Sequence, residues 1–287
     1  MEYSVLGKTG RKVSRIGFGG ATAGLKNYTG AFDPQSDKDR GELIAAIKRA
    51  YELGINYFDT AAGYGMGASE ELFGEGLSGI PAESIFLATK CGKGVNSDVR
   101  KSLEASLKRL RRDWIDLIQL HGTQYSDEEC DHILKPGGLL SQLEKAKADG
   151  LVKHIGFSNE CQNIPQYRLI ASGRFDVMQI QYNLLFQHPD DRSWKIGSLY
   201  DAEENGLGIV VMRTATSGIF QRFIQKVNPE NTFDYTPALI QMVLSNQLVD
   251  VALVGMRTVD IVEKNVAICL DTAGRIDLDD LHNRYAQ

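Results

Sequence analysis

The chain has 287 residues, 43% of them hydrophobic, so it is long enough to bury a substantial core. Charged residues make up 24% of the sequence and the formal net charge is only -5, which indicates neither a nucleic-acid-binding surface nor a polyanionic tail. No segment approaches 18 uninterrupted apolar residues, so no membrane span is expected. Small molecules are therefore the expected partners.

The four cysteines, Cys91, Cys130, Cys161 and Cys269, are widely spaced along the chain. They form no Cys-x-x-Cys pair and have no nearby histidine that would complete a zinc site, so no metal is expected. The N-terminus lacks the basic and apolar regions of a secretory signal. We therefore expect reduced thiols and a cytoplasmic location.

After a turn at Lys8-Thr9-Gly10, short apolar runs alternate with longer segments in which apolar residues recur every three or four positions. This alternation predicts a strand followed by a helix, repeated along the chain. The expected strands end in Ile16 to Phe18, Tyr57 to Asp59, Ile85 to Lys90, Leu117 to His121, His154 to Ser158, Val177 to Gln181, Ile209 to Arg213 and Val251 to Gly255.

Helices are expected between these strands, for example over Glu42 to Leu53 and Val99 to Leu110. Three glycines each follow a predicted helix and precede a strand, which is typical of helix C-caps: Gly54, Gly150 and Gly206. The segment Tyr3 to Ser14 is predicted to form a β-hairpin that closes the bottom of the fold.

Eight strand and helix units in fewer than 300 residues favour a (β/α)8 TIM barrel over a doubly wound sheet, which usually needs fewer strands. No linker or compositional break divides the sequence, so residues 1–287 are expected to form a single domain. The α/β class and the N-terminal hairpin complete the predicted fold.

The stretch Gly74-Glu75-Gly76-Leu77-Ser78-Gly79 matches the G-x-G-x-x-G dinucleotide fingerprint. That fingerprint requires a strand to deliver the glycines to a helix N-terminus, and here a helical segment precedes them. We therefore interpret the stretch as the end of a helix and a turn.

Four polar side chains follow the predicted strands on one rim of the barrel: Asp59, Tyr64, Lys90 and His121. Each alone has an ordinary structural explanation, such as a helix cap for Asp59 or a solvated charge for Lys90. Their shared position at the carboxyl ends of strands, where barrel enzymes place their active sites, favours a catalytic set.

These groups fit together chemically, because a tyrosine with an ordinary pKa of about 10 is a poor acid and base near neutrality. A nearby Lys90 ammonium would lower the pKa of Tyr64, and Asp59 would keep Lys90 charged. A carbonyl oxygen between Tyr64 and His121 would then be polarised as a hydride reaches the carbon.

The stretch Asn56-Tyr57-Phe58-Asp59-Thr60-Ala61-Ala62-Gly63-Tyr64-Gly65 resembles the signature of the aldo-keto reductase family. Ala88-Thr89-Lys90, Leu117 to His121 and Gly156-Phe157-Ser158-Asn159 are similar to its later blocks. The resemblance implies a catalytic tetrad of Asp59, Tyr64, Lys90 and His121, with Tyr64 as general acid and base. It also implies reduction of an aldehyde, ketone or sugar carbonyl, or oxidation of the alcohol.

The same resemblance implies a nicotinamide cofactor, with Ser158, Asn159 and Gln179 at the carboxamide and Met212 and Arg213 near the ring and pyrophosphate. The segment after Arg213 departs from the family pattern, which commonly continues with Pro-Leu. Further cofactor contacts are implied at Gly20, Gly255, Arg257 and Asn265.

Arg257 precedes a predicted helix N-terminus, a setting that favours phosphate, so NADP(H) is the favoured cofactor. Gly255, Met256 and Ile261 occupy positions where the tightest NADPH binders place Lys, Ser and a basic residue, so NAD(H) remains an option. The alternative for Arg257 is an ion pair with Asp260 or Glu263 on the same helix.

A second functional hypothesis is a cofactor-binding regulatory subunit with little turnover, because the resemblance extends to family members that modulate membrane channels. The particular substrate and the oligomeric state are left open. Trp114 and Trp194 are assigned to packing rather than to substrate stacking.

Overall fold

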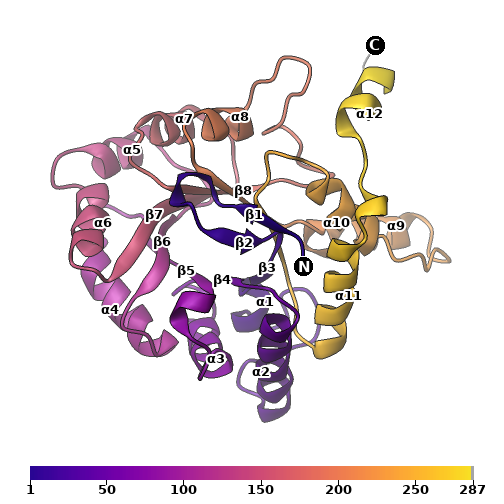
Figure 1. Ribbon diagram of the computed structural model, residues 1–287, viewed down its shortest axis with the longest axis horizontal. Coiled ribbons are helices and arrows are strands. Elements are labelled where there is room, and N and C mark those ends of the chain that lie inside the picture. Colours follow the sequence, from indigo (N-terminus) through magenta and orange to yellow (C-terminus); the bar gives the residue numbers. More distant parts are fainter. Residues whose placement is uncertain (286–287) are drawn as a thin grey trace.

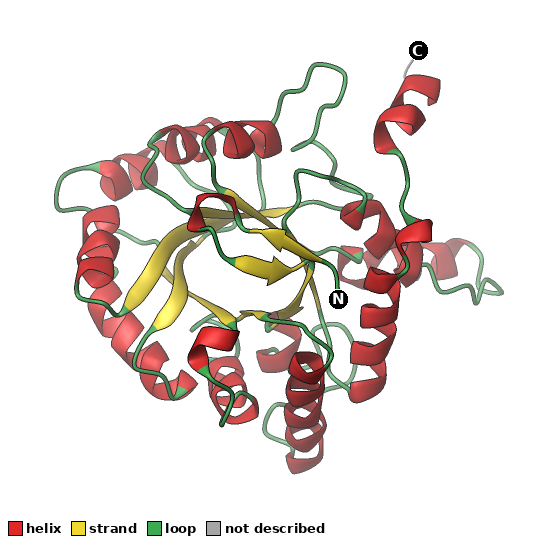
Figure 2. Ribbon diagram, in the orientation of Figure 1, coloured by secondary structure: helices red, strands yellow, loops and turns green. Residues whose placement is uncertain are grey.

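A closed barrel of eight parallel strands forms the centre of the computed structural model, which describes residues 1–285 (Figures 1 and 2). The strands are β3 (Ile16–Gly19), β4 (Tyr57–Asp59), β5 (Phe86–Gly92), β6 (Ile115–His121), β7 (Val152–Asn159), β8 (Val177–Gln181), β9 (Gly208–Met212) and β10 (Val251–Val254). Strand β10 pairs with β3 and so closes the barrel. The predicted TIM barrel and its eight strands are confirmed.

Helices surround the barrel, as Figure 2 shows. They are α1 (Ala21–Gly24), α2 (Asp37–Glu52), α3 (Ala68–Gly76), α4 (Val99–Leu110), α5 (Asp127–Leu134), α6 (Leu139–Ala148), α7 (Ile164–Ala171), α8 (Ser198–Glu204), α9 (Ile219–Val227), α10 (Thr236–Leu244), α11 (Val259–Leu270) and α12 (Leu278–Tyr285). In residues 1–285, none of these helices is long and apolar enough to cross a membrane.

The predicted helix Val99 to Leu110 is found with the same bounds, but the helix expected from Glu42 begins earlier, at Asp37. It does so because the Ser36 side chain accepts a hydrogen bond from the backbone N–H of Asp39 and caps the first turn. The three predicted capping glycines have left-handed φ angles: +91° for Gly54, +77° for Gly150 and +69° for Gly206. Their assignment as C-caps is confirmed.

The N-terminal hairpin consists of β1 (Tyr3–Val5) and β2 (Lys12–Ser14), joined through the short helix η1 (Gly7–Thr9). In Figure 1 it lies across the opening of the barrel. Leu6 and Val13 are fully buried against interior barrel residues such as Tyr57. The hairpin therefore closes the end of the barrel opposite the carboxyl ends of the strands, as predicted.

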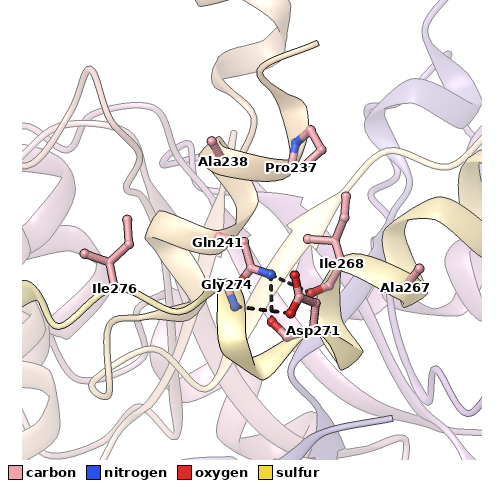
Figure 3. Close-up of a pocket in the computed structure, with 8 residues that line it drawn as sticks. All are labelled: Pro237, Ala238, Gln241, Ala267, Ile268, Asp271, Gly274 and Ile276. Atoms are coloured by element: carbon pink, nitrogen blue, oxygen red, sulfur yellow. Dashed lines mark hydrogen bonds between the residues drawn. The ribbon is translucent and has the colours of Figure 1, made fainter.

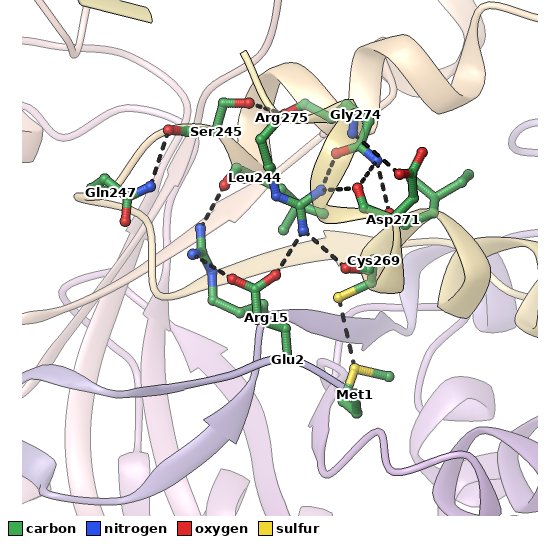
Figure 4. A network of polar contacts seen from close by, with 12 residues as sticks. Met1, Glu2, Arg15, Leu244, Ser245, Gln247, Cys269, Asp271, Gly274 and Arg275 are labelled. Carbon is green, nitrogen blue, oxygen red and sulfur yellow. Dashed lines mark hydrogen bonds and ion pairs between the residues drawn. The ribbon is translucent and has the colours of Figure 1, made fainter. Parts of the chain in front are cut away.

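Ion pairs tie the N-terminal segment to the segment that follows α11 (Figure 4). Glu2 binds Arg15 at 3.4 Å and Arg275 at 2.7 Å. Beside this network, a groove of about 380 Å³ runs between α10 and α11 and is lined by Gln241 and Asp271 among others (Figure 3). It is separate from the barrel rim that carries the predicted catalytic residues.

Two other predictions can be compared with the structure. Gly74 and Gly76 lie within α3, and Gly79 lies in the turn that follows, so the fingerprint-like stretch is a helix end and a turn, as expected. The assignment of Trp194 to packing is wrong, because its side chain is 78% exposed on the loop between β8 and α8. The loop runs from the end of β8 at Gln181 to the start of α8 at Ser198, outside the regular elements that form the core.

Candidate active site

The four predicted catalytic residues come from neighbouring parts of the barrel. Asp59 is the last residue of β4 and His121 the last residue of β6. Lys90 lies on β5 between them, although that strand continues to Gly92 and does not end at Lys90 as expected. Tyr64 lies in the loop between β4 and α3. Because all strands are parallel, these groups meet at the same rim.

Asp59 and Lys90 form a buried ion pair, with Lys90 Nζ 2.5 Å from Asp59 Oδ1 and side-chain exposures of 1% and 3% for Lys90 and Asp59. Lys90 Nζ also donates to the backbone carbonyl of Thr60 at 2.9 Å. Burial alone lowers the pKa of Lys90, but the Asp59 carboxylate and Tyr64 raise it by more, so the net pKa is above its usual value. Lys90 is therefore charged.

Tyr64 lies between Lys90 and His121. Lys90 Nζ is 5.2 Å from the centre of the Tyr64 ring, and the Tyr64 and His121 rings meet edge to face with centroids 5.4 Å apart. Burial raises the pKa of Tyr64, and the opposing effect of Lys90 only partly offsets it. The expected net lowering of this pKa is therefore not found in the protein alone.

The environment of His121 keeps its imidazole neutral. Burial, helped by the nearby Lys90 charge, lowers the pKa of His121 from 6.5 to about 4. A neutral imidazole carries one N–H donor, and this donor can bind a carbonyl oxygen. The site therefore combines a permanent cation, a phenol and a neutral hydrogen-bond donor.

A cavity of about 520 Å³ opens above these groups. All predicted site residues line it except Lys90 and Asn159: Gly20, Asp59, Tyr64, His121, Ser158, Gln179, Met212, Arg213, Gly255, Arg257 and Asn265. Lys90 reaches the cavity only through its contacts with Asp59 and Tyr64. Residues far apart in the sequence thus form one wall of side chains.

The side chain of Asn159 points away from the cavity. Its Nδ2 donates to the carbonyl of Cys161 at 2.5 Å and to Oε1 of Gln166 at 3.0 Å. Successive residues of a strand point to opposite faces, so the neighbouring Ser158 lines the cavity while Asn159 does not. This arrangement does not support the predicted carboxamide contact by Asn159.

Arg213 does line the cavity, but it is already paired. Its guanidinium lies 2.8 Å from Glu160 Oε1 and donates to the Tyr28 hydroxyl at 3.4 Å. After Arg213, where the family's Pro-Leu is missing, Thr216 and Ser217 have left-handed φ angles of +54° and +51°. The chain thus makes a tight turn just before α9, and Ala215, Ser217 and Gly218 of this turn line the cavity.

Arg257 is held by the loop that follows β3. Its Nε donates to Thr22 O at 2.9 Å and its Nη1 to Gly30 O at 3.1 Å, while the guanidinium lies over the Phe32 ring. Nη2 is buried and has no hydrogen-bond partner among residues 1–285. One guanidinium nitrogen of this cavity-lining residue is therefore left without an acceptor.

The alternative pairing of Arg257 with acidic residues of its own helix is not found. Asp260 pairs instead with Lys264 at 2.8 Å, and Glu263 pairs with Arg49 at 2.9 Å. Thr258 caps α11 by accepting a hydrogen bond from the N–H of Ile261, so Arg257 lies just before a helix N-terminus, as predicted.

The polar residues at the site that were not predicted include Gln119, Glu160 and Tyr28. Gln119 could have been found from the sequence, because it lies two positions before His121 and therefore on the same face of β6. Glu160 and Tyr28 lie in loops, and no sequence period indicates which loop side chains turn towards a cavity.

A (β/α)8 barrel with ionisable groups at the carboxyl ends of its strands is an enzyme architecture. Comparison with known proteins identifies the family. The model of the Aldo/keto reductase family matches residues 15–243, and the chain therefore belongs to this family.

Curated relatives carry the names of oxidoreductases. The chain is 29% identical to L-galactose dehydrogenase of Arabidopsis thaliana over 93% of its own length and 88% of that protein. It is also 29% identical to the NADH-specific methylglyoxal reductase of Escherichia coli, over 83% of this chain and 72% of that one.

Solved structures share the fold. An aldo-keto reductase from Bacillus halodurans in its holo form aligns with a TM-score of 0.74 at 22% identity, over 99% of this chain and 95% of that one. An aldo/keto reductase from Klebsiella pneumoniae in complex with NADP and acetate aligns with a TM-score of 0.73 at 19% identity, over 99% and 96% of the two chains.

Proposed function

We propose that this aldo/keto reductase transfers a hydride between NADP(H) or NAD(H) and the carbonyl carbon of a small aldehyde, ketone or sugar, with Tyr64 as general acid and base. The observation that carries the proposal is the Tyr64 phenol between charged Lys90 and neutral His121 at the wall of one cavity. This complete set supports turnover rather than a purely regulatory role.

The cavity wall fits a phosphate-bearing dinucleotide. The unpartnered Nη2 of Arg257 is a donor for phosphate, and Ser217 and Gly218, which line the cavity just before α9, place the N-terminus of that helix beside it. Ser158, Gln179 and Met212 line the same cavity as Tyr64 at the ends of their strands, and they suit the nicotinamide end. When bound, the cofactor supplies or accepts the hydride.

The residues of the chain handle the oxygen and its proton. In the reducing direction, Tyr64 donates its phenolic proton to the carbonyl oxygen as the carbon gains the hydride, so that C=O becomes CH–OH and Tyr64 becomes a phenolate. The neutral His121 donates a hydrogen bond to the same oxygen and directs it. The Lys90 ammonium stabilises the phenolate, and Asp59 keeps Lys90 in place.

The cofactor preference is argued from charge. Arg257 supplies one donor suited to a 2′-phosphate, whereas Gly255 and Ile261, which also line the cavity, carry no charge. The names of related proteins include both an NADH-specific enzyme and complexes with NADP. We therefore propose a preference for NADP(H) of moderate size.

The proposal is tested by Tyr64→Phe, which removes the phenolic proton and little else. We expect turnover of an aldehyde substrate to fall by about a hundred- to ten-thousand-fold, as is typical for loss of a general acid. The dissociation constant of the cofactor, measured by calorimetry, should stay within a few fold. Near-normal turnover in this variant would show that another group supplies the proton.

A further inference from the structure

Gln119 is a fully buried amide behind the cavity wall. It lies on β6, in register with Lys90 on β5 and Gly156 on β7. A Cβ atom on Gly156 would lie 2.6 Å from the Val177 carbonyl oxygen and 3.3 Å from Gln119 Cγ, so only a glycine fits beside the stem of Gln119. The position of Gln119 is therefore well defined by its neighbours.

The Gln119 amide joins two residues that face the cavity. Its Nε2 donates to Asp59 Oδ2 at 3.2 Å and to Gln179 Oε1 at 3.0 Å. Lys90 binds the other oxygen of Asp59, so the two oxygens of the carboxylate have separate partners. Both Asp59 and Gln179 line the cavity, and Gln119 stands behind them.

The chemistry of these groups determines which way each amide points. An ionised carboxylate only accepts hydrogen bonds, so Gln119 must direct its NH2 group towards Asp59. The second hydrogen of that group then needs an acceptor, which is the carbonyl oxygen of Gln179. The NH2 group of Gln179 then lies on the side of the cavity, where Met212 Sδ is 3.6 Å away and where it also interacts with the Asp59 carboxylate.

We propose that Gln119 is a positioning residue: by binding Asp59 and Gln179 at once, it presents the Gln179 NH2 group to the cofactor. The inference rests on the proposed function, in which Gln179 contacts the nicotinamide end. Without Gln119, the Gln179 oxygen loses the donor that holds it away from the cavity, and the amide can rotate so that this oxygen turns towards the cavity. A donor would then be replaced by an acceptor.

A double-mutant cycle measures this dependence without turnover. The dissociation constant of NADP+ is determined by calorimetry for the wild type, Gln119→Met, Gln179→Met and the double variant. Loss of one hydrogen bond corresponds to about a fivefold weaker affinity. We expect this loss for Gln179→Met, and a measurable loss that is no larger for Gln119→Met. The double variant should bind no more weakly than Gln179→Met alone.

Gln241→Met is the matched control. Gln241 is also a buried glutamine, and its Nε2 donates to the carbonyls of Ile268 and Asp271 at 2.9 Å, away from the cavity (Figure 3). It should lower the thermal unfolding midpoint and leave the dissociation constant unchanged. If Gln241→Met weakened NADP+ as much as Gln119→Met, general destabilisation would account for the effect and the positioning role would fall.

The other outcomes separate this inference from the proposed function. If the losses of NADP+ affinity in the two single variants multiplied in the double variant, the positioning role would be overturned and the proposed function would stand. Wild-type affinity in Gln119→Met would have the same consequence. Wild-type affinity in Gln179→Met would remove both the proposed contact and the role of Gln119, and an absence of any NADP+ binding would remove the proposed function. Gln119→Leu, which also lacks the donor, replaces Gln119→Met if that variant does not fold.

Discussion

At the scale of single residues, the site depends on charges that are buried together. Lys90 would lose its proton in an apolar interior, but the Asp59 carboxylate at 2.5 Å raises its pKa above the usual value. Tyr64 shows the opposite balance, because burial raises its pKa more than Lys90 lowers it. Lys90 therefore keeps its charge, whereas the phenolate form of Tyr64 is disfavoured by burial and depends on Lys90 for its stabilisation.

Replacing Lys90 with Met should therefore shift the pH profile. Lys90 lowers the pKa of Tyr64, so its loss leaves burial unopposed and raises that pKa further. In the direction of alcohol oxidation Tyr64 acts as a phenolate base, and we expect the rise of kcat with pH to move to higher pH. Steady-state kinetics under conditions where chemistry limits the rate provide the measurement. An unchanged profile contradicts the electrostatic role of Lys90.

His121 should make stability depend on pH. Its pKa is lowered from 6.5 to about 4, so the folded state binds fewer protons than the unfolded state between these values. Stability contributed by His121 is therefore present above its unfolded pKa and is lost as the pH falls towards the folded one.

The check is urea unfolding of the wild type and His121→Gln at about pH 7 and about pH 5. We expect the wild type to lose more unfolding free energy than the variant on going to the lower pH. Parallel losses in the two proteins would mean that the His121 imidazole titrates normally.

At the scale of elements, the N-terminal hairpin illustrates how backbone contacts close the barrel. Gly7 has a φ of +42°, and a Cβ atom there would lie 2.2 Å from the backbone nitrogen of Gly208. Lys8 N donates to the carbonyl of Gly206 at 2.7 Å. The hairpin thus lies directly on the start of β9, with no space for a side chain.

Gly7→Ala should destabilise the protein more than Gly10→Ala. Gly10 is also left-handed, with a φ of +66°, but a Cβ atom there would meet no atom within 4 Å. Gly10→Ala should therefore lower the free energy of unfolding by only about 1 to 2 kcal/mol, the cost of a left-handed backbone for alanine. Gly7→Ala should lower it further, because the hairpin backbone must also shift to make room for the methyl group. Chemical unfolding of both variants measures the difference. Equal losses would show that the hairpin moves away without penalty.

At the scale of the whole molecule, part of the cavity wall forms where the first barrel strand, β3, meets the last, β10. Strand β10 pairs with β3, and Arg257 beyond β10 binds the carbonyls of Thr22 and Gly30 beyond β3. Closure of the barrel thus brings together residues from the first and last strand units. The proposed phosphate contact exists only in the closed barrel.

Arg257→Ala should reduce the preference for NADPH over NADH. A charge-assisted hydrogen bond from Arg257 to the 2′-phosphate corresponds to about 1.5 to 3 kcal/mol, or roughly ten- to a hundredfold in affinity. Arg257 also holds the loop after β3, and loss of this support weakens both cofactors alike. The ratio of their dissociation constants, titrated at one ionic strength, therefore isolates the phosphate contact.

Equal dissociation constants for the two cofactors in the wild type would contradict the predicted preference. An unchanged ratio in Arg257→Ala would assign Arg257 to the loop alone.

The order of the strands and helices follows from the sequence by itself, because hydrophobic periodicity and capping residues are local properties. The eight apolar runs, the capping glycines and the placement of Asp59 and His121 at strand ends could all be derived in this way. The candidate catalytic set follows for the same reason, since parallel strands deliver their carboxyl ends to one rim.

The directions and partners of the side chains were decided by the tertiary structure. Asn159 turns to Gln166, Arg213 pairs with Glu160, and Gln119 joins Asp59 to Gln179. The balance of burial and charge at Tyr64 likewise depends on which groups surround it in space. These contacts join residues on different strands and loops, and their distances and desolvation exist only after the barrel has closed.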